Sequence, residues 1–291
     1  MNATVQAVQC PVCDQDLARH WGTEYKGHTI VKCAGCGLRY VNPRRNENVD
    51  RAVYDTDEYF ADGVQEESDP DRRNLRRAMY GDFCRRILGY CGNPHPSLLD
   101  VGTGTGLLLY AARETGFGLV AGTDVTDVNR DALAADGIPL IVGDITRMPA
   151  EDILKHVNSG GGFDAVSLSH VLEHVADPNV FLQALRRLLL PGGVLYLLVP
   201  NEGSVPSAVK SFMSRIGLKR RAYKHLSPGH HLFFYTRTTL RRVLEKNGFA
   251  IAYSGTRSRA KQRSTSGRVV HMLADALRTG TWLEVVARKP T

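Results

Sequence analysis

The sequence has little of what a secreted or membrane-spanning chain requires. Six of its 291 residues are cysteine, and no stretch approaches the roughly 18 uninterrupted apolar residues of a membrane-spanning helix. The first 25 residues are polar and contain no apolar core of a signal peptide. We therefore expect a cytoplasmic protein with reduced thiols and no transmembrane segment.

Extremes of composition are also missing. Hydrophobic residues make up 43% and charged residues 23% of the chain, a balance that excludes fibrous and fully disordered proteins. At about 150 residues per domain, the length predicts about two units. The charge is uneven, however: residues 201–291 contain 18 Lys and Arg against 4 Asp and Glu, whereas residues 98–200 contain 6 against 12. The last third, with a net charge of +14, is therefore expected to attract anions.

Four of the cysteines form two Cys-x-x-Cys pairs near the N-terminus. Cys10 and Cys13 are followed, after 19 intervening residues, by Cys33 and Cys36. Each pair brings two thiolates to one ion from a tight turn, and two pairs complete a tetrahedral shell. The pattern predicts a structural Zn²⁺ site in a zinc ribbon over residues 1–45. Two disulfides or four free thiols are the alternatives.

The segments around these pairs carry further local signals. Residues 23–32 have the pattern of two short strands around Lys26-Gly27, and Gly37 permits the positive φ of a metal-binding turn. Residues 46–96 are expected to form a helical connector or lid. Its first part is rich in aromatic and acidic residues, among them Tyr54, Asp57, Tyr59 and Phe60.

The second part of the connector predicts a helix that begins at Asp69-Pro70. Its apolar residues recur every four positions and so form one buried stripe, with arginines on the opposite, solvated face. The stripe consists of Leu75, Met79, Phe83 and Ile87. Cys84 and Cys91 have no pairing pattern, and we expect them to pack in the core.

From residue 97 to the end, apolar runs alternate with helical segments, which is typical of an α/β parallel sheet. The predicted strands are 98–101, 119–123, 139–142, 164–168, 193–199, 249–254 and 282–288. The predicted helices are 106–115, 128–136, 148–157, 178–190 and 236–246. Together they predict a seven-stranded doubly wound, Rossmann-like domain over residues 97–291, with the last strand antiparallel. Two basic insertions, 201–235 and 256–280, interrupt it.

A glycine-rich loop joins the first strand of this domain to its first helix. Gly102, Gly104 and Gly106 allow the backbone to approach a ligand at a helix N-terminus, where free N–H groups point outward. The sixth place counted from Gly102 is Leu107, so the dinucleotide fingerprint is not met, and no Gly-Lys-Ser/Thr follows that would indicate a P-loop. Asp100, just before the loop, suits a ligand with a cationic amino acid end.

In this region the chain resembles the class I S-adenosylmethionine-dependent methyltransferases. The loop Asp100-x-Gly102-x-Gly104-x-Gly106 matches their first motif, and residues 163–174 are similar to their strand-four motif. The resemblance implies S-adenosyl-L-methionine as cofactor, with Asp124 taking the ribose hydroxyls and Gly143-Asp144-Ile145 meeting the adenine. The full set of implied cofactor-binding residues is Asp100, Gly102, Thr103, Gly104, Gly106, Asp124, Val125, Asp144, Ile145, Ser169 and His170.

The N-terminal cysteine motif narrows the resemblance. Cys-x-x-Cys-Gly followed by residues 39–44 (RYVNPR) resembles bacterial methyltransferases of small-molecule, sugar or surface-glycan pathways that carry an N-terminal zinc ribbon. The acceptor expected from this resemblance is a small, anionic or hydroxylated biosynthetic molecule. A zinc-ribbon RNA methyltransferase that binds rRNA or tRNA through the basic last third is the alternative. A non-enzymatic reading, with a degenerate cofactor domain, is disfavoured by the intact acidic and glycine residues.

Histidines are the candidates for a general base, because a group with a near-neutral pKa assists methylation of a hydroxyl or an activated carbon. His170 lies at the carboxyl end of the fourth strand, where open α/β sheets bind ligands. His230 and His231 lie in the segment expected to cover the acceptor, and their alternative role is packing of that cover. A short basic helix with Phe212 on its apolar face is compatible with weak contact to an anionic membrane. The sequence does not indicate the oligomeric state.

Overall fold

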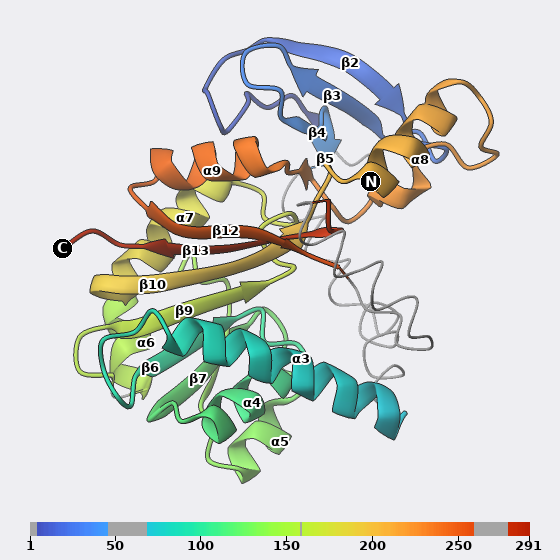
Figure 1. The fold of residues 1–291 in the computed structure, drawn as a ribbon. Coiled ribbons are helices and arrows are strands. Elements are labelled where there is room, and N and C mark those ends of the chain that lie inside the picture. Colours follow the sequence, from blue (N-terminus) through green and yellow to red (C-terminus); the bar gives the residue numbers. More distant parts are fainter. Residues whose placement is uncertain (1–4, 46–68, 158, 259–278) are drawn as a thin grey trace.

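The computed structural model describes residues 5–45, 69–157, 159–258 and 279–291, and its centre is a seven-stranded sheet (Figure 1). The strand order is β12-β13-β10-β9-β6-β7-β8. The strands are β6 Ser97–Val101, β7 Leu119–Asp124, β8 Leu140–Val142, β9 Phe163–Ser169, β10 Leu189–Pro200, β12 Ala250–Arg257 and β13 Trp282–Arg288. The prediction of a seven-stranded Rossmann-like sheet is confirmed.

The connections of the sheet place a crevice at its middle. β6 pairs in parallel with both β7 and β9, and β10 pairs in parallel with β9. The chain therefore runs from β6 outward to β8, and then returns to the other side of β6 to form β9. Open sheets bind ligands at such a reversal point, beyond the carboxyl ends of the strands. β13 is antiparallel to both of its neighbours, as predicted for the last strand.

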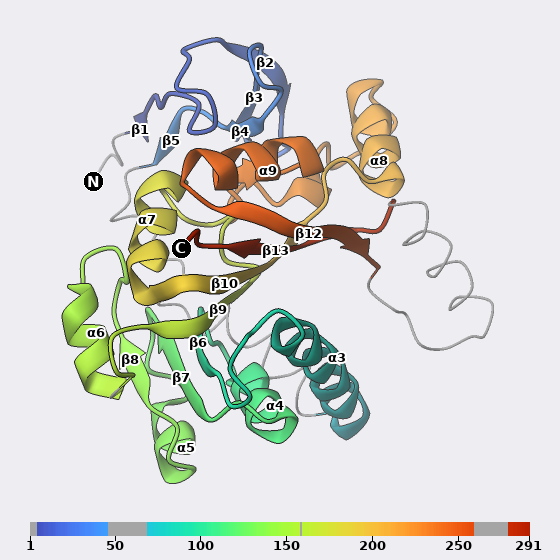
Figure 2. The same cartoon turned by 60° about the vertical axis from the view of Figure 1, so that its left-hand side comes forward.

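Helices cover both faces of the large sheet (Figures 1 and 2). One face carries α3 Pro70–Leu88, α4 Leu107–Thr115 and α5 Arg130–Ala135. The other carries α6 Ala150–Val157, α7 Pro178–Leu188 and α9 Arg237–Lys246. Each face has its own apolar core, as a doubly wound fold requires. No helix in the described part of the chain has the length and apolarity to cross a membrane.

The helix ends follow from local chemistry. The Asp69 carboxylate accepts hydrogen bonds from the backbone N–H groups of Asp71 and Arg72, so α3 begins where the sequence predicts. Helix α7 was expected to reach residue 190 but ends at Leu188, because the backbone of Leu189 is already extended and belongs to β10. The turn Pro191-Gly192-Gly193 is thus an irregularity inside a long strand rather than a loop before it.

The buried stripe of α3 is confirmed in part of its length. Phe83 and Ile87 are fully buried, whereas Leu75 and Met79 are half-buried at the N-terminal end of the helix. Cys84 lies in the same apolar core, and Cys91 packs against that core, as expected. The aromatic and acidic residues Tyr54, Asp57, Tyr59 and Phe60 lie outside the described residues, as does most of the insertion 256–280.

A second, four-stranded sheet contains the cysteine pairs and has the order β11-β4-β3-β2. The strands are β2 Ala18–Thr23, β3 Thr29–Cys33, β4 Arg39–Val41 and β11 Phe233–Phe234, and the short β1 Val5–Gln6 pairs with β5 Arg44–Arg45 beside them. The hairpin around Lys26-Gly27 is present, with Gly27 at a φ of +97°. β11 comes from the insertion 201–235, so the sheet is built from both ends of the chain.

This small sheet packs directly on the helices of the large one. The Lys246 ammonium group at the end of α9 lies 2.6 Å from Asp14 Oδ1 and 2.8 Å from the carbonyl oxygen of Pro11. Arg39 donates to the carbonyl oxygen of Glu202 at 2.7 Å. One continuous apolar core includes Tyr40 of the small sheet together with residues of α7 and α9. The cysteine-bearing sheet and the large domain therefore share buried surface.

Candidate functional site

A cavity of about 590 Å³ lies at the carboxyl ends of β6, β7 and β9. Most of the residues that the sequence predicts for cofactor binding line it. They are Asp100, Gly102, Thr103, Gly104, Asp124, Val125, Asp144, Ile145, Ser169 and His170. Gly106 is not among the lining residues; it stands at the N-cap of α4 with a φ of +78°. The cavity thus brings together the four loops that follow β6, β7, β8 and β9.

The glycine loop has backbone conformations that residues with a side chain rarely adopt. Gly102 and Gly104 have φ values of +74° and +53°. A Cβ atom on Gly102 would lie 2.5 Å from Val171 Cγ2, whereas a Cβ on Gly104 would meet no heavy atom within 4 Å. Gly102 is therefore required by protein packing, and the space at Gly104 lies open to the cavity that it lines.

Asp100 is buried at the end of β6, with 3% of its surface exposed. Burial raises the pKa of its carboxyl group to about 7; the hydrogen bond from Ser167 lowers this pKa and the charge of Asp124 raises it. Ser167 Oγ donates to Asp100 Oδ1 at 2.6 Å. A carboxylate in this setting gains most from a ligand that brings a positive charge.

Asp124, at the end of β7, organises the glycine loop. Its Oδ2 accepts a hydrogen bond from the N–H of Gly104 at 2.9 Å, and its Oδ1 accepts from the backbone N–H and hydroxyl of Thr126, both at 3.1 Å. The neighbouring Thr123 hydroxyl is buried and has no hydrogen-bond partner in the described structure. A buried polar atom of this kind at a cavity wall indicates a place for ligand or water.

Asp144 follows β8 in the third loop. Its Oδ1 accepts from the backbone N–H of Thr146 at 3.0 Å and from the Thr146 hydroxyl at 2.7 Å, which closes the turn. Its Oδ2 lies 3.2 Å from Arg147 Nε. Ile145, beside it, is 4% exposed and presents an apolar wall. The loop therefore offers the cavity a hydrogen-bond-accepting carboxylate next to an apolar side chain.

Comparison with known proteins identifies the family. Residues 71–254, more than half of the chain, match the family model described as a methyltransferase domain. The chain belongs to this methyltransferase family. The resemblance seen in the glycine loop and the ordered acidic residues is thereby confirmed. The match begins inside α3, so this helix belongs to the methyltransferase unit as the model defines it.

Several named methyltransferases are similar to parts of the chain. It is 35% identical over 106 residues to the ubiquinone biosynthesis O-methyltransferase of Caulobacter vibrioides, which covers 36% of this chain and 41% of that protein. It is 24% identical over 234 residues to the tRNA 5-carboxymethoxyuridine methyltransferase of Escherichia coli, which covers 74% of this chain and 88% of that protein. The chain thus spans less than half the length of the first of these relatives.

Solved structures agree on the fold. The magnesium protoporphyrin IX methyltransferase of Synechocystis PCC 6803, with SAH bound, superposes with a TM-score of 0.56 and 17% identity over 84% of this chain and all of that one. The Burkholderia thailandensis 1,6-didemethyltoxoflavin-N1-methyltransferase gives a TM-score of 0.55 and 16% identity over 89% and 97%. At these identities the likeness establishes the architecture of the methyltransferase fold.

His170 is the predicted base that the structure places in the cavity wall. Its φ of +58° is unusual for a residue with a side chain, and its backbone N–H donates to Leu198 O at 2.8 Å. Its Nδ1 lies 3.2 Å from Oε1 of Glu173, which is 1% exposed. The ring also packs edge-on against Trp282, with the centroids 5.1 Å apart. The imidazole is therefore held on two sides.

His230 and His231 lie elsewhere. Neither lines the cavity. The His231 ring packs edge-on against His174 with centroids 4.7 Å apart, and its burial lowers its pKa to about 4. His230 is exposed, and its carbonyl oxygen accepts a hydrogen bond from His174 Nδ1 at 3.0 Å. The segment before β11 thus closes over the turn after β9.

Some lining residues were not expected from the sequence. Arg76 and Tyr80 of α3 reach the cavity, although the arginines of this helix were assigned to a solvated face. They are four positions apart, beside the buried stripe, and this spacing is the signal that could have indicated them. Leu232, just before β11, lines the cavity as well.

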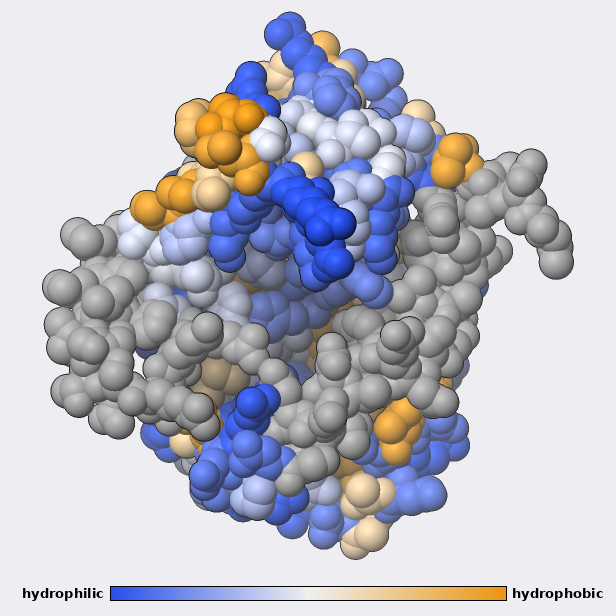
Figure 3. Space-filling view, turned by 90° about the vertical axis from the view of Figure 1, so that its right-hand side faces the viewer, coloured by the Kyte–Doolittle hydropathy of each residue, from blue (hydrophilic) through white to orange (hydrophobic). Residues whose placement is uncertain are grey.

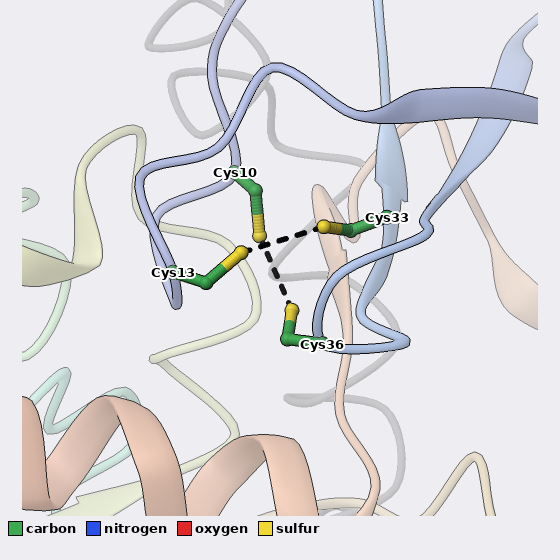
Figure 4. A group of neighbouring side chains, drawn as sticks. All are labelled: Cys10, Cys13, Cys33 and Cys36. Atoms are coloured by element: carbon green, nitrogen blue, oxygen red, sulfur yellow. Dashed lines mark hydrogen bonds between the residues drawn. The ribbon is translucent and has the colours of Figure 1, made fainter.

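The four cysteines of the ribbon converge on one point (Figure 4). The sulfur atoms of Cys10 and Cys36 are 3.4 Å apart and those of Cys13 and Cys33 are 3.5 Å apart, and all four are free thiols. Disulfide sulfurs lie about 2.05 Å apart, whereas thiolates at about 2.3 Å around a tetrahedral ion are about 3.8 Å apart. Gly37 has a φ of +82°, as the metal-turn prediction requires. The geometry fits a Zn²⁺ ion.

Helix α8 (Val205–Arg215) and the loop after it carry an exposed apolar surface (Figure 3, upper left). The serines of α8 face inward, and Ser211 Oγ lies 3.1 Å from His225 Nε2. The exposed apolar residues are Val205, Val209, Phe212, Ile216 and Leu218. Six basic and no acidic residues accompany them between positions 204 and 224. The helix thus turns its polar side to the protein and its apolar side to solvent.

Proposed function

We propose that the methyltransferase transfers a methyl group from S-adenosyl-L-methionine to a hydroxyl group of a small, anionic biosynthetic molecule. The observation that carries the proposal is His170, fixed in the cavity wall by the buried carboxylate of Glu173. Because Nδ1 faces Glu173, Nε2 is the basic nitrogen of the ring. A base so placed beside the cofactor loop suits an acceptor that must lose a proton as it is methylated.

The three acidic residues of the cavity would hold the cofactor. Asp100 would pair with its cationic amino acid end, Asp124 would accept from its ribose hydroxyls, and Asp144 would accept from its adenine amine, with Ile145 packing on the ring. When bound, the cofactor supplies an electrophilic methyl group on a sulfonium. The protein must then align the acceptor oxygen with this methyl group, and the fixed glycine loop holds the cofactor in place for this without reorganisation. His170 Nε2 accepts the proton of the acceptor hydroxyl.

The raised pKa of Asp100 gives a testable pH dependence. The cationic end of the cofactor favours ionised Asp100, whose pKa is about 7 in the free protein, so binding must first remove a proton at lower pH. We expect the cofactor to bind about tenfold more weakly at pH 6 than at pH 8. Calorimetry across this range measures the effect. Asp100→Asn should bind weakly at both values, and an unchanged pH slope in this variant would contradict the assignment.

A tRNA or rRNA acceptor is the second candidate. It is supported by the basic surface around α8 and by the match to the Escherichia coli tRNA methyltransferase over most of that protein's length. The small-molecule proposal is favoured because the α8 surface joins its charge to five exposed apolar side chains, a combination that suits an anionic bilayer better than a phosphate backbone. The proposed partners are therefore the small acceptor and, weakly, an anionic membrane surface.

A labelled-methyl screen tests the acceptor. Purified protein with tritiated cofactor is given total RNA, or a small-molecule extract with or without anionic vesicles, each with and without nuclease. We expect label in the small-molecule pool, insensitive to nuclease, and loss of at least 100-fold in rate in His170→Ala, because general-base catalysis contributes about 10²–10⁴-fold. Label in RNA that nuclease releases would replace this proposal by the second candidate.

A further inference from the structure

A cluster of three metal-ligand side chains lies beside the cavity, away from the cysteines. Glu173 and His174 come from the turn after β9, and His231 comes from the segment before β11. One ligand atom from each lies within 4.8 Å of the other two. We propose that Glu173, His174 and His231 bind a divalent transition-metal ion of the Zn²⁺ or Co²⁺ type.

Glu173 supplies the charge that such an ion requires. The residue is 1% exposed, and its Oε1 faces His170 Nδ1 at 3.2 Å. Its Oε2 is buried and has no hydrogen-bond partner in the described structure. An ionised carboxylate oxygen shielded from water and left without a partner is costly, and a cation is the group that offsets this cost. In the described part of the chain, its ion-pair contacts are with His170 and His174 alone.

His174 is oriented as a ligand. Its Nδ1 lies 3.0 Å from the carbonyl oxygen of His230, so this nitrogen carries the proton. Its Nε2, which then carries the lone pair, faces Glu173 Oε1 at 3.9 Å. Metal-bound histidines characteristically donate their second N–H to a backbone carbonyl or a carboxylate, which fixes the ring and its tautomer. The hydrogen bond to His230 is of this kind.

His231 completes the set. Its ring stands edge-on to His174 with an interplanar angle of 82°, and one nitrogen of each ring lies within 4.8 Å of the other and of a Glu173 carboxylate oxygen. The side chain of His231 is half-buried beside the other two ligands. Two imidazoles and one carboxylate are the ligand set of open zinc sites, in which the remaining position is left for water or substrate. Such ligands select transition metals over Mg²⁺.

The position of the cluster gives the ion a role, and this step rests on the proposed function. His174 lines the cavity together with His170. An acceptor hydroxyl bound at the open position would ionise more easily, because the ion stabilises its oxygen anion. The O–H bond breaks, the proton passes to His170, and the oxygen forms the new bond to the methyl carbon as the carbon–sulfur bond breaks.

Cobalt binding separates this site from the cysteines. Protein already loaded with one equivalent of zinc is titrated with Co²⁺, and absorption spectra are recorded. We expect one further equivalent to bind, with d–d bands but without the charge-transfer bands of thiolate ligands. Glu173→Gln and His231→Ala should each weaken this binding at least 100-fold. His230→Ala, which removes a neighbouring exposed imidazole but leaves the carbonyl group, should change it by less than about threefold.

Two results would overturn the proposal: no cobalt uptake beyond the cysteine site by folded protein, or equal uptake by the wild type and Glu173→Gln. Far-ultraviolet dichroism of each variant establishes that it is folded. The affinity for S-adenosyl-L-methionine, measured on the same samples, tests cofactor binding separately from metal binding. A protein that takes up cobalt as expected but transfers no methyl group would retain the metal site and refute the proposed function.

Discussion

Replacement of Asp124 by alanine is expected to weaken cofactor binding at least about 100-fold. The substitution would remove the carboxylate and with it two hydrogen bonds from the ribose hydroxyls, each worth about 1.5–3 kcal/mol when the acceptor is charged. It would also remove the hydrogen bond from the Gly104 N–H to Asp124, and this bond fixes the glycine loop in the free protein. Isothermal titration with S-adenosyl-L-methionine measures the change.

Two further variants make this result interpretable. Asp124→Asn keeps one acceptor oxygen for the Gly104 N–H and is expected to lie between the wild type and the alanine variant. Asp131→Ala removes an exposed carboxylate from nearby α5, outside the cavity, and should bind the cofactor normally. Equal affinity in Asp124→Ala and Asp131→Ala would refute the ribose assignment.

Loss of the cysteine site is expected to destabilise the whole protein and not the ribbon alone. Cys10→Ser combined with Cys33→Ser removes two thiolates from a site of a type that contributes about 10–16 kcal/mol of binding free energy in isolated zinc fingers. Because the small sheet shares its core with α7 and α9, the loss should lower the melting temperature of the whole protein, by 10 °C or more at about 2–4 °C per kcal/mol. Elemental analysis and thermal unfolding measure both effects.

Cys91→Ser provides the matched control, since Cys91 is a half-buried cysteine outside the cluster. It should retain near-stoichiometric zinc and melt close to the wild type. Chelator treatment of the wild type should reproduce the double variant. Folded wild-type protein that contains no metal, or a double variant that melts at the wild-type temperature, would contradict a structural role for the ion.

The local parts of the site could be read from the sequence because each depends on nearby residues. The glycine loop requires positive φ at Gly102 and Gly104, and Asp100 and Asp124 lie at the carboxyl ends of strands whose apolar pattern is plain. Parallel strands end at one edge of the sheet, so Asp100 and Asp124 had to lie close together. The convergence of the cysteines was predictable for the same reason, since the Cys-x-x-Cys spacing brings the two thiols of each pair close together.

The remaining parts depend on contacts between distant segments. The four-residue spacing of Arg76 and Tyr80 places both on one side of α3, but it does not show that this side meets the cavity. His231 meets Glu173 and His174 through the docking of a loop almost sixty residues away. The periodicity that assigned residues 189–190 to a helix failed because apolar residues suit a buried strand equally well.

The pairing of β11 with β4 sets an order for assembly during synthesis. Tyr40 and Phe233 are partners in the sheet although they stand 193 positions apart. The ribosome must add 193 residues after Tyr40 to reach Phe233 and cover the edge of β4, and contacts of such long range form late. A cation bound by the four cysteines would require only residues up to Cys36. It would therefore stabilise the ribbon before β11 is synthesised and pairs with β4. The cysteine-bearing sheet is thus synthesised well before the strand that completes it.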